Sequence, residues 1–120
     1  MSIEVNNKII QTDEEGYLVN LDDWSDEVCD ALIKQHEADG FKPVEEITRG
    51  LIDYFRAYYQ EHQVHPSMHK LVLTLGKDQG EHFRDQESFK NFLYELFPDG
   101  PVRMLCKLAG LPKPVDETET

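Results

Sequence analysis

Residues 47–59 read ITRGLIDYFRAYY, and this stretch carries the helical pattern on which the fold prediction rests. Its large apolar residues lie three or four positions apart, which places them on one face of a helix. They are Ile47, Leu51, Tyr54, Phe55 and Tyr58. Pro43 is favoured in the first turn of a helix and predicts where this one begins. We expect a long helix with its apolar face in a hydrophobic core.

Four other segments repeat this spacing before and after that helix. Their apolar stripes are Trp24, Val28, Ala31 and Leu32; Met68, Leu71, Val72 and Leu75; Phe89, Phe92, Leu93 and Leu96; and a short one from about Val102 to Ala109. Residues typical of helix ends bound them, namely Asp22, Asp23, Ser25, Gly40, Pro66, Gly76, Asp85, Gly110 and Pro112. The sequence therefore predicts about five helices.

The first ten residues read as a β-hairpin at about 3–10, because two short apolar runs flank Asn6-Asn7, which tolerates a tight turn. Residues 17–19 are a possible third strand. The predicted fold class is mainly α, a small helical bundle with an N-terminal β-hairpin and a flexible C-terminal arm. We expect one domain over 1–115, with a helical core at about 24–109, the arm from 110 and a disordered acidic tail at 116–120.

Acidic residues outnumber basic ones by 24 to 12, which gives a net charge of −12. This excess argues against general nucleic-acid binding and against docking on an anionic membrane, since both need Lys and Arg. No apolar run approaches the roughly 20 residues of a membrane span, and the N-terminus lacks the pattern of a secretory signal. The expected location is the cytoplasm.

Three histidines lie close together in the sequence, namely His62, His65 and His69. Two of them are four apart, the spacing of helical metal ligands, but Pro66 interrupts the helix between them and no third ligand matches. Surface or capping roles are favoured, so we expect neither a metal nor a cofactor.

A helix-turn-helix is an alternative reading of the two helices joined near Pro66. Only His69, Lys70 and Thr74 would reach DNA from residues 68–75, and the surrounding charge is repulsive. Two packed core helices fit the pattern better.

The two cysteines, Cys29 and Cys106, are too far apart in sequence for a disulfide framework or a zinc site. Cys29 fits a half-buried apolar position. Cys106 falls at the border of an apolar arc, toward Arg103 and Lys107. A partly exposed thiol beside two cations has a lowered pKa, which favours the nucleophilic thiolate. Cys106 is therefore the candidate catalytic thiol, with Arg103 and Lys107 supporting the thiolate, and an inert cysteine is the alternative.

Four motifs, in the right order and covering nearly the whole chain, resemble one known family. They are DEEGYLVNLDDW at 13–24, FRAYY at 55–59, LYELFPDGP at 93–101 and CKLAGLPKP at 106–114. Together they are similar to the DsrC/TusE/DsvC family of sulfur-relay proteins.

The resemblance implies a small helical domain with a hairpin and a mobile arm, in which a cysteine at the next-to-last arm position carries sulfur as a persulfide. TusE-type members accept sulfur from upstream carriers and work with a tRNA 2-thiouridylase. DsrC-type members serve dissimilatory sulfite reductase, and a second cysteine on their last helix forms a disulfide or trisulfide with the arm cysteine. The implied partners are the proteins of such systems.

The chain departs from the family pattern in the arm. Cys106 matches the helix cysteine, but the arm cysteine is expected at position 117, which is Glu117, after Asp116 in place of glycine. A carboxylate forms no persulfide, so arm-cysteine transfer is predicted lost. Thr48-Arg49 stands where the family has a His-Trp pair, and His69 where an Arg is typical.

Three functions follow as hypotheses. The first is an atypical sulfur-relay protein, sulfurtransferase-like, whose thiol chemistry uses Cys106. The second is a non-catalytic adaptor or regulator that keeps the docking surface of the family. The third is a DNA-binding regulator.

Overall fold

The computed structural model describes residues 1–78 and 86–114. Two strands and a 3-10 turn precede five helices in the described chain. They are β1 (Ser2–Val5), β2 (Lys8–Gln11), η1 (Leu21–Asp23), α1 (Asp26–Ala38), α2 (Glu46–His62), α3 (Met68–Asp78), α4 (Gln86–Leu96) and α5 (Pro101–Leu108). This confirms the predicted mainly-α fold with an N-terminal hairpin. The expected cap at Asp85 and the acidic tail at 116–120 lie outside the described residues.

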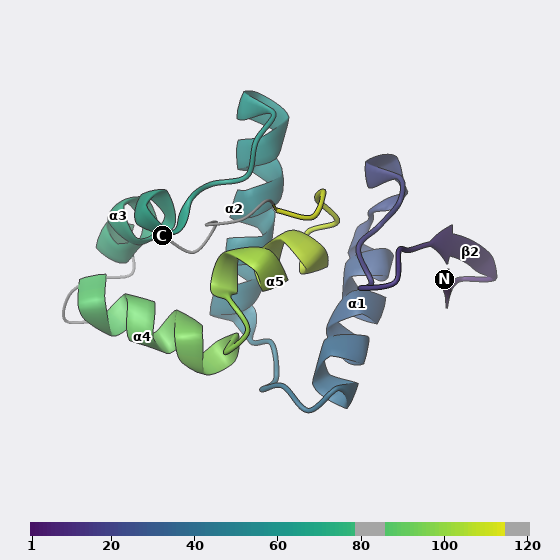
Figure 1. Ribbon diagram of the computed structural model, residues 1–120, viewed down its shortest axis with the longest axis horizontal. Coiled ribbons are helices and arrows are strands. Elements are labelled where there is room, and N and C mark those ends of the chain that lie inside the picture. Colours follow the sequence, from purple (N-terminus) through teal and green to yellow (C-terminus); the bar gives the residue numbers. More distant parts are fainter. Residues whose placement is uncertain (79–85, 115–120) are drawn as a thin grey trace.

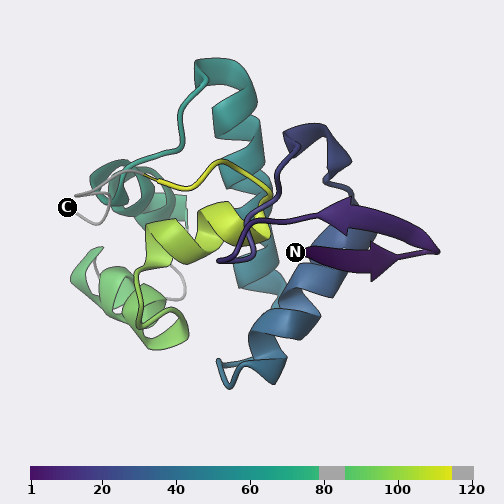
Figure 2. The ribbon, with the colours of Figure 1, turned by 45° about the vertical axis from the view of Figure 1, so that its right-hand side comes forward.

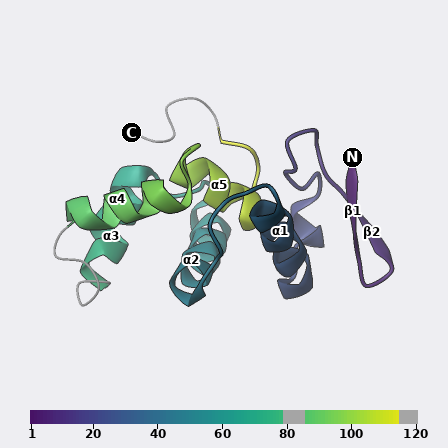
Figure 3. The ribbon, with the colours of Figure 1, turned by 90° about the horizontal axis from the view of Figure 1, so that it is seen from below.

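The short helix α5 is the centre of the arrangement. It packs against α1, α2 and α4, while α3 packs against α4 and β1 against α1. Figure 1 shows α5 crossing in front of α2, with α3 and α4 on one side and α1 and the hairpin on the other. Seen from below, the α3–α4 pair, α2, α1 and the hairpin follow one another across the molecule (Figure 3). No helix in the described ranges has the length and apolar character that a membrane crossing requires.

Strands β1 and β2 form an antiparallel hairpin in which Val5 lies opposite Lys8. Asn6 and Asn7 form its turn with φ of 52° and 67°, the positive values that a tight two-residue hairpin turn demands. The suggested third strand is reduced to a single bridge between Thr12 and Leu18. Figure 2 shows the hairpin lying beside α1.

Three helix boundaries differ from the prediction. Trp24 precedes α1, whose N-cap is Ser25, with Oγ accepting from the Val28 amide at 3.2 Å. The long helix α2 begins at Glu46 rather than near Pro43. The Val44 amide donates to the Glu37 carboxylate at 2.9 Å, and the N-cap residue Glu45 has an extended backbone. Helix α3 continues past Gly76 to Asp78.

The core is built around α5, of which Val102, Leu105, Cys106 and Leu108 are all at most 1% exposed. Fully buried aromatic and aliphatic side chains from α2, α3 and α4 surround it, namely Leu51, Ile52, Phe55, Leu71, Phe89 and Leu93. A helix of eight residues has marginal stability alone, so this packing holds it in place.

Candidate functional site

The candidate thiol lies inside the protein. The Cys106 residue is 0% exposed, so the prediction of a partly exposed position is wrong. The physical reason is that a helical wheel assumes one face in water, whereas neighbours cover α5 on several sides. Its proposed role as a nucleophile stays a prediction.

Lys107 and Arg103, the two cations expected to support the thiolate, make contacts with different parts of the protein. The Lys107 side chain lies against Gly16, where an added Cβ would sit 2.7 Å from Lys107 Cε. It also lines a cavity of about 60 Å³ together with buried His36, whose pKa burial lowers. Arg103 is partly buried, and its carbonyl accepts a hydrogen bond from the Tyr17 hydroxyl at 3.2 Å. Support of the thiolate by either cation stays a prediction.

Tyr17 is a site residue that the sequence analysis did not single out. Its ring is 3% exposed and reaches α5 from the loop that follows the hairpin. Burial raises the pKa of Tyr17 well above its usual value, and the nearby Cys106 thiol raises that pKa further. The phenol is therefore neutral and acts as a donor beside the cysteine. Its place in the motif at 13–24 is the sequence signal that could have identified it.

The loop carrying Tyr17 has a defined shape. The Asp13 carboxylate accepts from the amides of Glu15 and Tyr17 at 2.8 and 3.0 Å. Gly16 turns the chain with a φ of +93°, which an L side chain rarely adopts. The Glu15 carboxylate pairs with Lys113 Nζ at 2.5 Å. This loop thus touches α5 at Arg103 and Lys107 and the arm at Lys113.

The end of α5 is also held by side chains from other elements. Trp24 Nε1 donates to the Leu108 carbonyl at 3.0 Å, and Arg56 Nη1 donates to the Ala109 carbonyl at 2.8 Å. The amides of Gly110 and Leu111 close the helix by donating to the carbonyls of Lys107 and Cys106, the pattern of a Schellman motif. These donors satisfy backbone carbonyls that a helix end leaves without partners.

The start of the arm is therefore anchored. Gly110 has a φ of +70°, and a Cβ there would lie 2.5 Å from Trp24 Cδ1. Leu111 is 2% exposed and Pro114 is buried. Position 117, where the family resemblance places the sulfur-carrying cysteine, lies outside the described residues.

The other cysteine has a different environment. Cys29 on α1 is 0% exposed, more buried than the half-buried position expected for it, and burial raises the pKa of its thiol to about 11. Arg49 opposes that rise. The two cysteines form no disulfide.

The three clustered histidines do not converge on one point. His62 ends α2, His65 Nδ1 lies 2.8 Å from the Pro66 carbonyl, and His69 lies on α3. Within 1–78 and 86–114, no group of three or more His, Cys, Asp or Glu residues is arranged to hold a metal.

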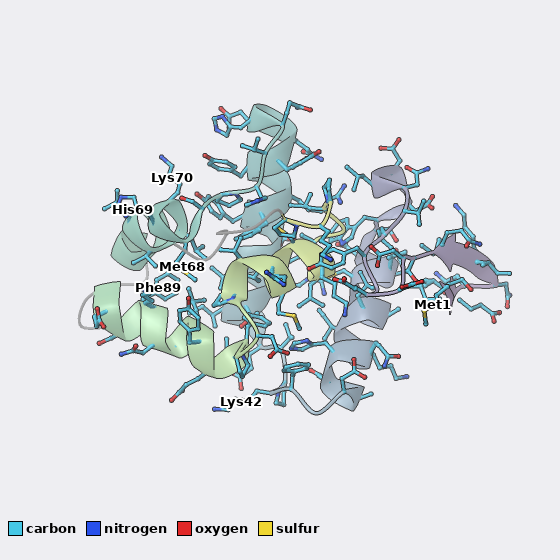
Figure 4. The ribbon with its side chains drawn as sticks, in the orientation of Figure 1. Met1, Lys42, Met68, His69, Lys70 and Phe89 are labelled. Carbon is cyan, nitrogen blue, oxygen red and sulfur yellow. The ribbon has the colours of Figure 1, made fainter. Side chains whose placement is uncertain are left out.

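The helix-turn-helix alternative rests on α3, which packs chiefly against α4. Figure 4 shows His69 and Lys70 pointing away from the body of the protein, whereas Met68 and Phe89 face the α3–α4 contact. DNA binding through α3 stays an alternative prediction.

The comparisons with known proteins agree with one another. A family profile described as "DsrC like protein" matches residues 4–116. The sulfurtransferase TusE of Yersinia pestis is 37% identical over 113 residues, which cover 94% of this chain and 96% of that protein. The dissimilatory-type sulfite reductase subunit gamma of Nitratidesulfovibrio vulgaris is 33% identical, with 93% of each chain covered. The NMR structure of Allochromatium vinosum DsrC superposes with a TM-score of 0.77 at 39% identity, covering 96% of this chain and 97% of that one. The chain therefore belongs to the DsrC-like family.

Proposed function

We propose that this chain is a sulfur-relay protein in which the arm no longer carries sulfur and any thiol chemistry uses Cys106. One observation carries the proposal: Cys106 is present at the position of the family's helix cysteine, while Glu117 stands where the arm cysteine is expected. Relatives named as a TusE sulfurtransferase and as a sulfite reductase subunit support the pathway class. Its partners are proteins of such a system in the cytoplasm.

The step available to Cys106 is a sulfane-sulfur transfer. Its thiolate attacks the outer sulfur of a persulfide on the partner's cysteine, a new S–S bond forms, and the partner's own S–S bond breaks. The partner leaves as a thiolate and Cys106 becomes a persulfide. No external oxidant or reductant is needed, because the number of S–S bonds does not change.

Burial of Cys106 sets a condition on this step. The thiol is 0% exposed, so a partner reaches it only after part of its cover moves. The loop that carries Tyr17 contacts α5 at Arg103, one turn before Cys106. The arm starts at Gly110, one turn after Cys106. Transfer through Cys106 is therefore slow unless partner binding displaces one of these segments.

Mass spectrometry of the intact protein tests the proposal. After incubation with a low-molecular-weight persulfide donor, we expect the mass of one added sulfur atom on Cys106, and none in Cys106→Ser. Cys29→Ser is the matched control and should load normally. Absence of added sulfur on Cys106, with the donor shown active on a model thiol, would refute the transfer.

The buried thiol also favours a second function, a non-catalytic adaptor that docks sulfur-relay partners. Pull-down with the candidate relay proteins, using both the unchanged chain and Cys106→Ser, separates the two. An adaptor binds equally in both forms and takes up no sulfur. Failure to bind any relay protein would count against both functions.

A further inference from the structure

Two arginines on α2 lie seven residues apart, two helical turns, and differ in their direct ion pairs. Arg49 pairs with Asp30 at 2.7 Å and with Asp26 at 3.4 Å. Its pKa is raised, chiefly by the hydrogen bond to Asp30. Arg56 forms no ion pair within 4.0 Å in the described part of the chain; burial lowers its pKa, and the nearby Asp22 carboxylate offsets part of that change. In a protein with net charge −12, a half-buried cation that forms no direct ion pair is unusual.

The contacts of Arg56 fix its guanidinium but use few of its donors. Nη1 donates to the Ala109 carbonyl, and the guanidinium carbon lies 4.3 Å from the centre of the Trp24 ring. A guanidinium has five N–H donors in a planar fork. The remaining donors are available for a planar acceptor such as a carboxylate, which the fork binds through two parallel hydrogen bonds.

Arg56 lines a groove of about 240 Å³ between α2 and the start of the arm. Gln60 and Gln63 add amide groups along α2, and Leu21 and Leu111 form apolar rims. Tyr59 and Asp22 complete the lining. We propose that this groove binds a carboxylate presented by a short segment of a partner polypeptide, with Arg56 as the anchor.

Three features favour this ligand over a free inorganic anion. The Asp22 carboxylate and the net charge of −12 repel a doubly charged anion more strongly than a single carboxylate. The glutamine amides suit the peptide groups on either side of the carboxylate. The leucine rims provide apolar surface, which an inorganic ion does not use.

The inference goes beyond the sulfur-relay proposal and does not depend on Cys106. Cys106→Ser should therefore bind the ligand as the unchanged protein does, even if no sulfur transfer is ever found. Failure of one proposal is thus distinguishable from failure of the other.

Trp24 provides the measurement, because it is the only tryptophan and lies under the Arg56 guanidinium. The probe is an acetylated, amidated tripeptide with a central glutamate between two leucines. We expect a saturable change in Trp24 fluorescence with a dissociation constant on the order of millimolar. The tripeptide with glutamine at the centre should bind at least about tenfold more weakly.

Gln60→Glu is the decisive variant. It places a carboxylate four residues after Arg56 on the same helix, where the two groups form an ion pair and occupy the fork. We expect the affinity to fall by at least about tenfold without loss of helix content. Asn91→Asp, at an exposed position on α4, makes the same charge change elsewhere and should leave the affinity unchanged. Arg49→Ala should also leave it unchanged.

Several results would overturn the proposal. One is equal binding of the glutamate and glutamine tripeptides, and another is full affinity in Gln60→Glu. If acetate saturates the signal at the same concentration as the tripeptide, the ligand is a free carboxylate and not a polypeptide segment. If changing Asp116, Glu117 and Glu119 together to their amides raises the affinity tenfold, the groove belongs to the chain's own tail.

Discussion

The two cysteines have the same exposure for different reasons. Cys29 is one side chain on the inner face of α1, and its helix keeps an exposed acidic face toward water. Cys106 lies on a helix that is buried almost whole. The backbone carbonyls of α5 and of its C-cap Ala109 are covered too, and they accept hydrogen bonds from Tyr17, Trp24 and Arg56. The first site is held by apolar packing, and the second also by polar side chains from distant parts of the chain. Opening the second site therefore requires breaking a small number of identifiable bonds.

Among the changes near Cys106, Gly110→Ala is expected to lower the stability of the protein most strongly. The new Cβ meets Trp24 at 2.5 Å and has to adopt a φ of +70°, so we expect a loss of about 2–4 kcal/mol of unfolding free energy in urea. Gly50→Ala on α2 is the matched control, since nothing lies within 4 Å of its Cβ. It should raise stability by up to about 1 kcal/mol. Equal effects of the two changes would show that the arm base is not anchored.

Alkaline pH is expected to destabilise the protein through the buried Cys29 thiol. The pKa of Cys29 is about 11 in the folded protein and 9.0 in the reference state, so the folded state keeps its proton longer. This contribution to the free energy of unfolding is complete below pH 9.0 and is lost as pH rises toward 11, by about 3 kcal/mol in total. The free energy of unfolding in urea should fall between pH 8 and pH 10.5, and it should fall less in Cys29→Ala than in the unchanged protein. The same pH dependence in Cys29→Ala would assign the effect to another group.

Tyr17→Phe removes one hydroxyl from the Cys106 side and keeps the buried ring. Loss of the bond to the Arg103 carbonyl should cost about 1 kcal/mol and speed the alkylation of Cys106, followed by mass spectrometry. Cys29 alkylation in the same sample is the internal control. Tyr58→Phe, at a partly exposed position on α2, should change neither rate. If both cysteines become faster together, the variant has loosened the whole fold.

Lys113→Ala tests the weakest contact, the exposed pair with Glu15. We expect a loss of at most about 0.5 kcal/mol at low salt, because exposed pairs contribute little. The loss should vanish at high salt, where screening removes the attraction. A large loss that persists in salt would mean that Lys113 packs the arm through its alkyl chain instead.

The elements of this fold followed from local patterns that depend on one stretch of chain. The Asn6-Asn7 turn, the Ser25 cap and the stripe on α2 were all predictable because φ preferences and helical spacing act locally. The exposure of Cys106 was not, since it depends on what α1, α2 and α4 place around α5.

The candidate site was predictable only in part for the same reason. Cys106 was found from its neighbours in sequence, but Tyr17 and Arg56 reach α5 across 86 and 53 residues. Arg56 lies in the FRAYY motif at 55–59, but nothing in that motif shows what its side chain contacts. Only the tertiary structure shows that it lacks the ion pairs of Arg49.

The anchored Leu111 limits how far the arm can reach. Position 117 is six residues further on, so covalent geometry allows it at most roughly 20 Å from that fixed point. Any molecule that meets residue 117 has to come within this radius of the end of α5. The anchored Leu111 thus limits where a partner of residue 117 can bind. The Arg56 groove, which Leu111 itself lines, lies within that distance.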